Sequence, residues 1–265
     1  MKVAFVYFAY SKDELLLTQS LRSVERVRKN RASDTFDVFV IDDEKSPLLN
    51  VPNGVYYQRS TFERCGNLNG IACVCGMLKV YEEIANKGYD WICKVDCDTY
   101  INDVDWFASL NVEDYANAGM YNHLSFAHGC FYALTKKGIN AIRRLWDSPS
   151  VRARAEKRVC EDQIFSHLCE MSGLMCARYS NVKNRLGKRG TGYQDTEWVG
   201  RVPRLENPDK DLLMRHISVT FKQNMHFRTE EEANADRADA IVRMTAYADY
   251  VDEADAVCEL MRESC

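Results

Sequence analysis

The sequence lacks the features of several protein classes. No apolar stretch approaches the roughly 18 residues that a membrane-spanning helix needs, so we expect no transmembrane segment. The opening residues, MKVAFVYFAY, have no small-residue cleavage site and therefore indicate a first strand rather than a secretory signal. Internal repeats and low-complexity segments are absent as well. We expect a soluble globular protein with a cytoplasmic location.

Cysteine pairs at zinc-binding spacing are also missing. The chain has 11 cysteines, but none of them forms the repeated CxxC pairs of structural zinc sites. Several lie inside apolar patterns such as IACVCGML. This placement favours mostly reduced thiols in the core of a protein from a reducing compartment.

The charges that are present are unevenly distributed. The net charge is -4, yet residues 143–158 and 183–204 each carry six Lys or Arg against two acids. Residues 229–265 carry eleven acids and three arginines. The middle of the chain is therefore suited to meet an anion, although an evenly solvated surface explains either basic run taken alone.

Strand and helix patterns alternate in the first half of the chain. Residues 2–9, 36–41, 55–58 and 90–95 are expected to form strands, with helices following the first strand near Ser11 and spanning residues 71–86. The first strand is nearly continuous apolar sequence, as in a parallel strand covered on both faces. This order predicts an α/β fold with a doubly wound, mainly parallel sheet of Rossmann-like type.

The second half is less regular. We expect a strand over residues 130–134 and helices over 136–146 and 162–171. Residues 181–211 are rich in Gly, Pro, Asn and basic side chains, which predicts a long functional or mobile loop. Residues 230–262 indicate one or two acidic amphipathic helices.

Two aspartates follow the central strand in the segment WICKVDCDTYI. Asp96 and Asp98 end an apolar run, and ligands of open α/β sheets bind outside the carboxyl ends of strands. In an extended chain the two side chains project to the same side, so both carboxylates can reach one divalent cation and its bound diphosphate. Hard oxygen ligands suit Mg²⁺ or Mn²⁺. Most isolated pairs of this kind are solvated loop carboxylates, but the preceding strand favours a site.

Three segments resemble a known family. KVDCDTYI is similar to the K-x-D-D-D-T-Y run of fringe-like inverting β-1,3-glycosyltransferases, which have the GT-A fold. HGCFYALTKKGINAI resembles the glycine-aromatic segment near their donor sugar, and CEDQIFSHL resembles their x-E-D motif. Cys97 departs from the acidic triple, and the tail has no counterpart in the family. The resemblance implies a GT-A catalytic domain over residues 1–228 and a helical extension over 229–265.

The resemblance also implies the catalytic groups. Glu161 and Asp162 are neighbours at a helix start and point about 100° apart, so only one of them faces a cleft. The motif makes Asp162 the catalytic base, with Glu161 orienting the acceptor or serving the helix N-terminus. Ordinary first-turn acids, favoured by the helix dipole, are the alternative.

Further residues are expected to bind the nucleotide sugar. Asp42 and Asp43 end the second strand, where an acid accepts a hydrogen bond from ribose or base, though a strand-end turn explains them nearly as well. Arg64 resembles a basic nucleotide contact of the family. Asn67 and Asn69 suit either that site or a turn and helix cap.

The late segment HISVTFK resembles a metal and diphosphate site of related glycosyltransferases. In that comparison His216 joins Asp96 and Asp98 on the metal, and Lys222 meets the diphosphate; His226 is the competing ligand. A lone histidine is more often structural. His128 and Gly129 are placed near the substrate by the family's glycine-aromatic segment, although His128 could merely pack.

The sequence therefore predicts a metal-dependent enzyme that moves a sugar from a nucleoside diphosphate sugar, with UDP-sugars favoured, to a hydroxyl acceptor. The resemblance implies inversion. A glycan or glycolipid precursor is the default acceptor, and the basic runs leave a hydroxymethylated DNA base open. A non-catalytic nucleotide-sugar-binding or scaffold protein is the second alternative. A sugar nucleotidyltransferase is disfavoured because AYSKDELLL replaces the glycine-rich basic loop of that class.

Overall fold

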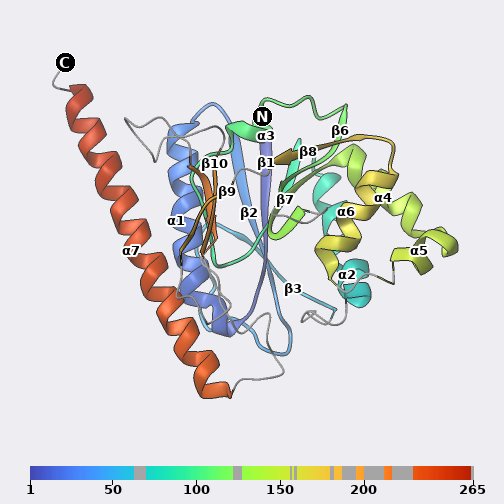
Figure 1. The fold of residues 1–265 in the computed structure, drawn as a ribbon, viewed down its shortest axis with the longest axis horizontal. Coiled ribbons are helices and arrows are strands. Elements are labelled where there is room, and N and C mark those ends of the chain that lie inside the picture. Colours follow the sequence, from blue (N-terminus) through green and yellow to red (C-terminus); the bar gives the residue numbers. More distant parts are fainter. Residues whose placement is uncertain are drawn as a thin grey trace.

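The computed structural model describes most of the 265-residue chain. The described residues are 1–62, 70–121, 127–155, 157, 160–179, 182–186, 195–199, 212–216 and 229–263. For residues 182–186, 195–199 and 212–216 the backbone alone is described. Figure 1 shows the elements in chain order.

A seven-stranded sheet forms the centre of the molecule, in the order β3-β2-β1-β4-β7-β6-β8. β7 pairs antiparallel with β4 and β6, and the other pairings are parallel. The strands are β1 (Lys2–Ala9), β2 (Thr35–Asp42), β3 (Tyr56–Arg59), β4 (Trp91–Val95), β6 (Tyr115–Tyr121), β7 (Ala127–Thr135) and β8 (Met175–Tyr179). This topology confirms the predicted α/β class with a mainly parallel, mixed sheet.

Helices cover both faces of this sheet (Figure 1). α1 (Glu14–Asn30), the short α3 (Asp105–Ala108) and α7 (Glu230–Glu263) lie on one face. The other face carries α2 (Gly70–Ala85), α4 (Lys136–Trp146), α5 (Pro149–Ala155) and α6 (Glu161–Met171). β1 shows why, because Phe5 and Tyr7 pack in the first apolar layer while Ala4 and Val6 pack in the second. A strand buried on both faces needs the continuous apolar run seen in its sequence.

A second, four-stranded sheet lies beside the first, in the order β5-β11-β10-β9. Its strands are β5 (Thr99–Ile101), β9 (Val182–Leu186), β10 (Asp195–Val199) and β11 (Leu212–His216), all paired antiparallel. The prediction of an unbroken loop over residues 181–211 is therefore wrong, since β9 and β10 fall within it. β10 pairs with β11 and β9 pairs with β10, so these strands are specified by pairing rather than by a local apolar pattern.

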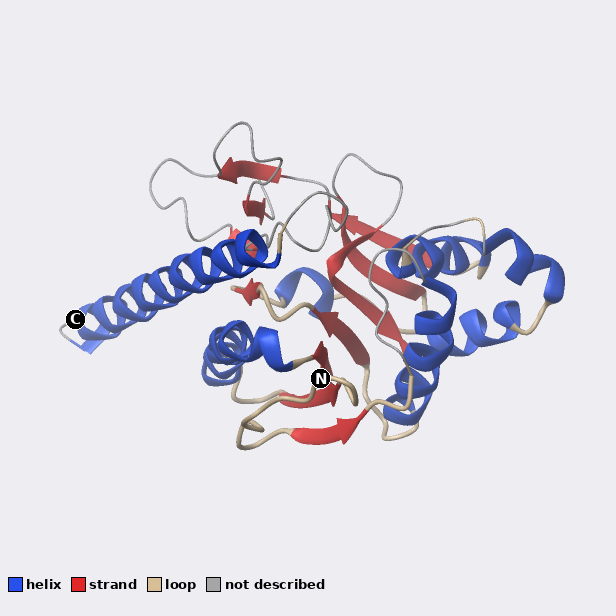
Figure 2. Cartoon of the chain, turned by 90° about the horizontal axis from the view of Figure 1, so that it is seen from below, coloured by secondary structure: helices blue, strands red, loops and turns tan. Residues whose placement is uncertain are grey.

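The acidic tail forms one helix, α7, which lies against α1 (Figures 1 and 2). Met244 and Ala248 are fully buried in the same apolar cluster as β1. Arg22 on α1 pairs with Asp249 at 2.9 Å and with Asp252 at 2.5 Å. Part of the acidity of the tail is therefore explained by arginines on the neighbouring helix.

The described residues also bear on the expectations of reduced cysteines and of no membrane-spanning helix. None of the eight cysteines with described side chains is in a disulfide, and five of them are buried. Among the helices of the described segments, none is long and apolar enough to cross a membrane.

Candidate active site

The carboxyl edge of the main sheet gathers residues that are distant in sequence. β1, β2 and β4 run in parallel and end at this edge, and the antiparallel β7 begins there. The amide of Asp96, the first residue after β4, donates to the carbonyl of Cys130 on β7 at 2.9 Å. The first residues of β7 therefore lie beside the aspartate pair that follows β4.

The aspartate pair lies in a turn rather than in an extended chain. The amide of Thr99 donates to the carbonyl of Asp96 at 3.0 Å, which closes a four-residue turn between β4 and β5. The expectation of two side chains two residues apart along an extended strand was therefore wrong at this point. The turn is possible because β4 ends at Val95 and β5 starts at Thr99 to join the second sheet.

The two aspartates and the cysteine between them differ in exposure. The side chain of Asp96 is 26% exposed, whereas Asp98 is 1% exposed. Cys97 is 2% exposed and belongs to the apolar cluster under α1. A third acid at position 97 would place a carboxylate among apolar side chains, at a high desolvation cost. The departure of Cys97 from the family's acidic triple therefore has a local physical reason.

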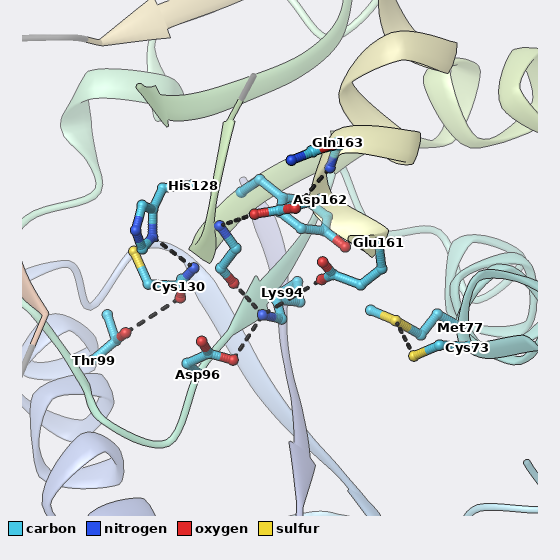
Figure 3. Close-up of polar contacts among 12 residues, drawn as sticks. Cys73, Met77, Lys94, Asp96, Thr99, His128, Cys130, Glu161, Asp162 and Gln163 are labelled. Atoms are coloured by element: carbon cyan, nitrogen blue, oxygen red, sulfur yellow. Dashed lines mark hydrogen bonds and ion pairs between the residues drawn. The ribbon is translucent and has the colours of Figure 1, made fainter. Parts of the chain in front are cut away.

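Lys94 on β4 is the centre of the polar contacts at this edge (Figure 3). Its side chain is 9% exposed, and its ammonium lies 2.7 Å from Asp96 Oδ1 and 3.6 Å from Glu161 Oε1. The same ammonium donates to the carbonyl oxygen of Gly129 on β7. One buried cation thus contacts three segments of the chain: the end of β4, the start of β7 and the start of α6.

The two acids at the start of α6 point to different partners, as their spacing predicts (Figure 3). Glu161 faces Lys94, and its Oε1 is buried without a hydrogen bond in the described part of the chain. Asp162 accepts hydrogen bonds from the amide of Gly129 at 3.0 Å and from that of Gln163 at 2.7 Å. A Cβ at position 129 would stand 3.1 Å from Asp162 Oδ2, so glycine leaves room for the carboxylate.

Burial raises the pKa of both acids. The pKa of Glu161 rises from 4.5 to about 8, chiefly because burial penalises the charged form, while Lys94 opposes the rise. The pKa of Asp162 is also raised, again mainly by burial; Lys94 and the two backbone donors oppose this rise. Neighbouring carboxyl groups with raised pKa values are the arrangement that proton-transfer chemistry uses.

His128 completes this part of the edge. Its Nδ1 accepts a hydrogen bond from the amide of Cys130 at 3.2 Å, so the side chain folds back along β7 (Figure 3). The structure brings His128, Gly129, Asp96 and both acids of α6 to the same edge of the sheet.

The fit of these residues to a divalent cation rests on the donor set and on the strand register. Among the described side chains, no three His, Cys, Asp or Glu residues are grouped closely enough to hold a metal ion. The third expected ligand, His216, belongs to β11, where its Cα pairs with that of Thr99, next to Asp98. Asp96 and Asp98 supply carboxylate oxygens, a ligand type that suits Mn²⁺ or Mg²⁺. The described side chains thus supply part of a ligand set, and the backbone register brings His216 beside it.

The expected nucleoside contacts lie at the end of β2. Asp42 is fully buried, and its carboxylate accepts from the amide of Leu48 at 3.0 Å and from the hydroxyl of Tyr57 at 2.6 Å. Asp43 is partly exposed and accepts from the amide of Lys45 at 2.8 Å. Both carboxylates thus take part in the turn that follows the strand.

Other expected site residues cannot be compared in this way. Arg64, Asn67, Asn69, Lys222 and His226 lie outside the described residues.

Two residues near the site were given no function in the sequence interpretation, although Lys94 opens the segment KVDCDTYI. Lys94 could have been found from its pattern, because a lysine inside the buried run WICKV needs a partner of opposite charge. Arg237 on α7 could not, since its partners are remote in sequence. Its guanidinium donates to the hydroxyl of Tyr10 and lies 3.7 Å from Asp13, both just after β1.

No known protein-family model matches the chain, and no curated protein is significantly similar to it in sequence. Three solved structures illustrate what its fold is similar to. The first is a glycosyltransferase involved in glycosylating the major capsid of PBCV-1, at 12% identity, with 92% of this chain and 100% of that chain covered and a TM-score of 0.49. The second is a Drosophila β-1,4-galactosyltransferase 7 in complex with manganese, UDP-Gal and xylobiose, at 14% identity, 88% and 79% coverage and a TM-score of 0.45.

The third is the galactosyltransferase LgtC in complex with donor and acceptor sugar analogues, at 11% identity, 68% and 73% coverage and a TM-score of 0.43. All three of those proteins are glycosyltransferases. Identities and scores as low as these leave the assignment of a function to the geometry of the site.

Proposed function

We propose that the chain is a metal-dependent, inverting glycosyltransferase that moves a sugar from a nucleoside diphosphate sugar, with UDP-sugars favoured, to a hydroxyl of a glycan or glycolipid precursor. One observation carries the proposal. The x-E-D motif at the start of α6 and the aspartates after β4 are 63 or more residues apart in sequence, yet Glu161 of the one and Asp96 of the other both contact Lys94. The motifs that resemble a glycosyltransferase thus share one site.

Asp162 is the proposed catalytic base. Its Oδ2 is held by the amide of Gly129, and its raised pKa makes it a better proton acceptor than an exposed aspartate. It takes the proton of the acceptor hydroxyl while the acceptor oxygen forms a bond to the anomeric carbon. The bond from that carbon to the diphosphate oxygen breaks on the opposite side, and the diphosphate leaves with the electron pair. Glu161 is proposed to orient the acceptor.

Asp96, Asp98 and His216 are the proposed ligands of Mn²⁺ or Mg²⁺. The register that places His216 opposite Thr99 supports this set. When bound, the ion supplies charge neutralisation for the leaving diphosphate. Lys222 is the proposed second diphosphate contact, and Arg64 and Asn69 remain proposed nucleotide contacts. His128 and Gly129 are proposed to lie against the substrate.

Asp42 and Asp43 are the proposed nucleoside contacts. Asp43 is the more accessible of the two, since Asp42 is fully buried and its carboxylate already accepts from Leu48 and Tyr57. For the chain as a whole, residues 1–228 are proposed as the catalytic domain and residues 229–265 as a helical extension of it.

The test is release of nucleoside diphosphate from a panel of nucleotide sugars, with Mn²⁺, Mg²⁺ or a chelator and a set of hydroxyl acceptors. We expect metal-dependent release from one donor, lost in Asp98→Ala and Asp98→Asn because both remove a ligand charge. Asp239→Ala is the matched control, because Asp239 is exposed on α7 and, among the described residues, pairs only with Arg243 at 2.8 Å. Full activity in either Asp98 variant contradicts the metal role. Metal-dependent donor binding without release from any donor or acceptor would favour a binding protein instead.

Asp162→Asn separates transfer from binding. The amide keeps the size of the carboxylate but cannot accept the acceptor proton. We expect donor binding close to that of the wild-type protein and transfer lowered by about 10²–10⁴-fold. Normal transfer by this variant would remove Asp162 as the base.

A further inference from the structure

We propose that Lys94 is a positioning residue that couples the metal-binding aspartate Asp96 to the base Asp162 through Gly129. This inference rests on the proposed function and gives a function to Lys94, which the motif comparison does not. It is carried by the contacts of one buried ammonium group with residues on three elements.

The first step is the position of Lys94 on β4. Its Cα pairs with Val6 on one side and with Tyr132 on the other, so it belongs to a central strand of the sheet. A lysine there is 7% exposed, which costs free energy unless its charge is compensated. An exposed lysine would avoid this cost. A buried one is retained here with carboxylates around it.

The second step is the contact with Asp96. The ammonium holds Asp96 Oδ1 at 2.7 Å, so this oxygen and the rotation of the side chain are set by Lys94. The charged hydrogen bond fixes which face of the carboxylate is presented to a cation. Lys94 thereby orients the side chain that is proposed to bind the metal.

The third step is the contact with Gly129. Its carbonyl oxygen accepts from Lys94, and its amide donates to Asp162 Oδ2 at 3.0 Å. The same glycine thus receives one hydrogen bond from the metal side of the site and gives another to the base. A shift of Gly129 changes the position of Asp162 or breaks this hydrogen bond, because N–H···O hydrogen bonds tolerate only a narrow range of lengths.

The fourth step is charge. Glu161 lies 3.6 Å from the ammonium and is otherwise without a hydrogen bond to its Oε1 in the described part of the chain. Lys94 is therefore also the cation beside a mostly buried acid that precedes the base. Because this second task is structural, a test of positioning must be separated from a test of charge balance.

The test uses Lys94→Met in a Glu161→Gln background. Methionine has a similar length without the ammonium, and the Glu161→Gln substitution removes a titratable group beside Lys94, so the loss of Lys94 cannot act through a change in the protonation of Glu161. All values are compared with Glu161→Gln alone. Lys137→Met in the same background is the matched control, since Lys137 is half-exposed and contacts only Glu113 among the described residues.

Two readouts are expected to change. The first is hydrogen exchange of the Gly129 amide, followed by NMR; we expect it to become at least about 10-fold faster, because Gly129 loses the donor to its carbonyl. The second is kcat, which we expect to fall by about 100-fold because the base is misplaced, with a rise in donor KM because Asp96 also loses the group that orients it. Lys137→Met is expected to change neither.

Gly129→Ala tests the same coupling at Asp162 instead of at Lys94. Its new Cβ would stand 3.1 Å from Asp162 Oδ2, which is closer than ordinary contact and displaces the carboxylate. Combined with Lys94→Met, it should lower kcat by less than the product of the two single effects, since both act on the same side chain.

The outcomes separate the two proposals. If the wild-type protein turns over no donor, the proposed glycosyltransferase function fails; if only Glu161→Gln is inactive, the function stands. In both cases exchange at Gly129 alone decides the coupling. If the parent is active and Lys94→Met leaves either the exchange of Gly129 or kcat unchanged within about twofold, the positioning role is wrong. Multiplicative effects of Lys94→Met and Gly129→Ala overturn it as well.

Discussion

At the scale of single residues, the site concentrates ionisable groups where water has little access. Glu161 is the clearest case, because its pKa is raised to about 8 by burial against the opposing effect of Lys94. Between about pH 4.5 and pH 8 the folded chain binds a proton at Glu161 that the unfolded chain releases. Stability therefore falls as the pH rises through this window, and the loss is complete above the folded pKa.

Glu161→Gln makes this dependence measurable, since the amide does not titrate. We expect the free energy of unfolding of the wild-type protein to fall, relative to Glu161→Gln, by on the order of 1–3 kcal/mol between about pH 5 and about pH 8. Urea unfolding at several pH values gives the comparison. Glu113→Gln is the control, because the Glu113 side chain is 73% exposed and should follow the wild-type curve. Parallel curves for Glu161→Gln and the wild-type protein would show that Glu161 ionises normally.

At the scale of elements, the sequence predicted those strands and helices whose burial shows in their own residue pattern. β1 and α4 were predicted with the observed bounds, because an apolar run buried on both faces and an amphipathic repeat are local signals. β9 and β10 were missed, since a segment such as VKNRL becomes a strand only by pairing. The site divides in the same way. The acids were predicted by motif, whereas the contacts of Lys94 depend on how three elements meet.

The packing of α7 on α1 supplies the prediction at this scale. Met244 is fully buried in the main apolar cluster, whereas Val242 on the same helix is 67% exposed. Met244→Ala should lower the free energy of unfolding by about 2–5 kcal/mol, because it leaves a cavity between the helices. Val242→Ala should change it by less than about 0.5 kcal/mol. Equilibrium unfolding in urea measures both, and equal effects of the two substitutions would mean that α7 is not docked as described.

At the scale of the whole molecule, charge bears on the acceptor. The basic run in α4 and α5 is partly neutralised where it lies, since Arg143 pairs with Asp147 at 3.1 Å and with Glu82 at 3.8 Å. The guanidinium of Arg152 stacks over the ring of Trp146 and is therefore engaged in packing. α7 adds a strongly acidic helix to a chain of net charge -4. These features favour a small or neutral acceptor over a polyanion.

The full-length protein is therefore expected to bind neither a plain duplex nor one containing hydroxymethylated bases in a salt-sensitive manner. Fluorescence anisotropy between about 50 mM and about 200 mM salt tests this, with the nucleotide sugar and Mn²⁺ present so that an ordered mechanism is not missed. A DNA-acting enzyme that makes several phosphate contacts would lose about 10³–10⁵-fold in affinity over that range. A loss of this size, together with transfer to the modified base, would move the proposed acceptor from glycans to DNA. Transfer to a glycan acceptor at a rate that does not depend on salt would support a glycan as the acceptor, in agreement with the charge distribution.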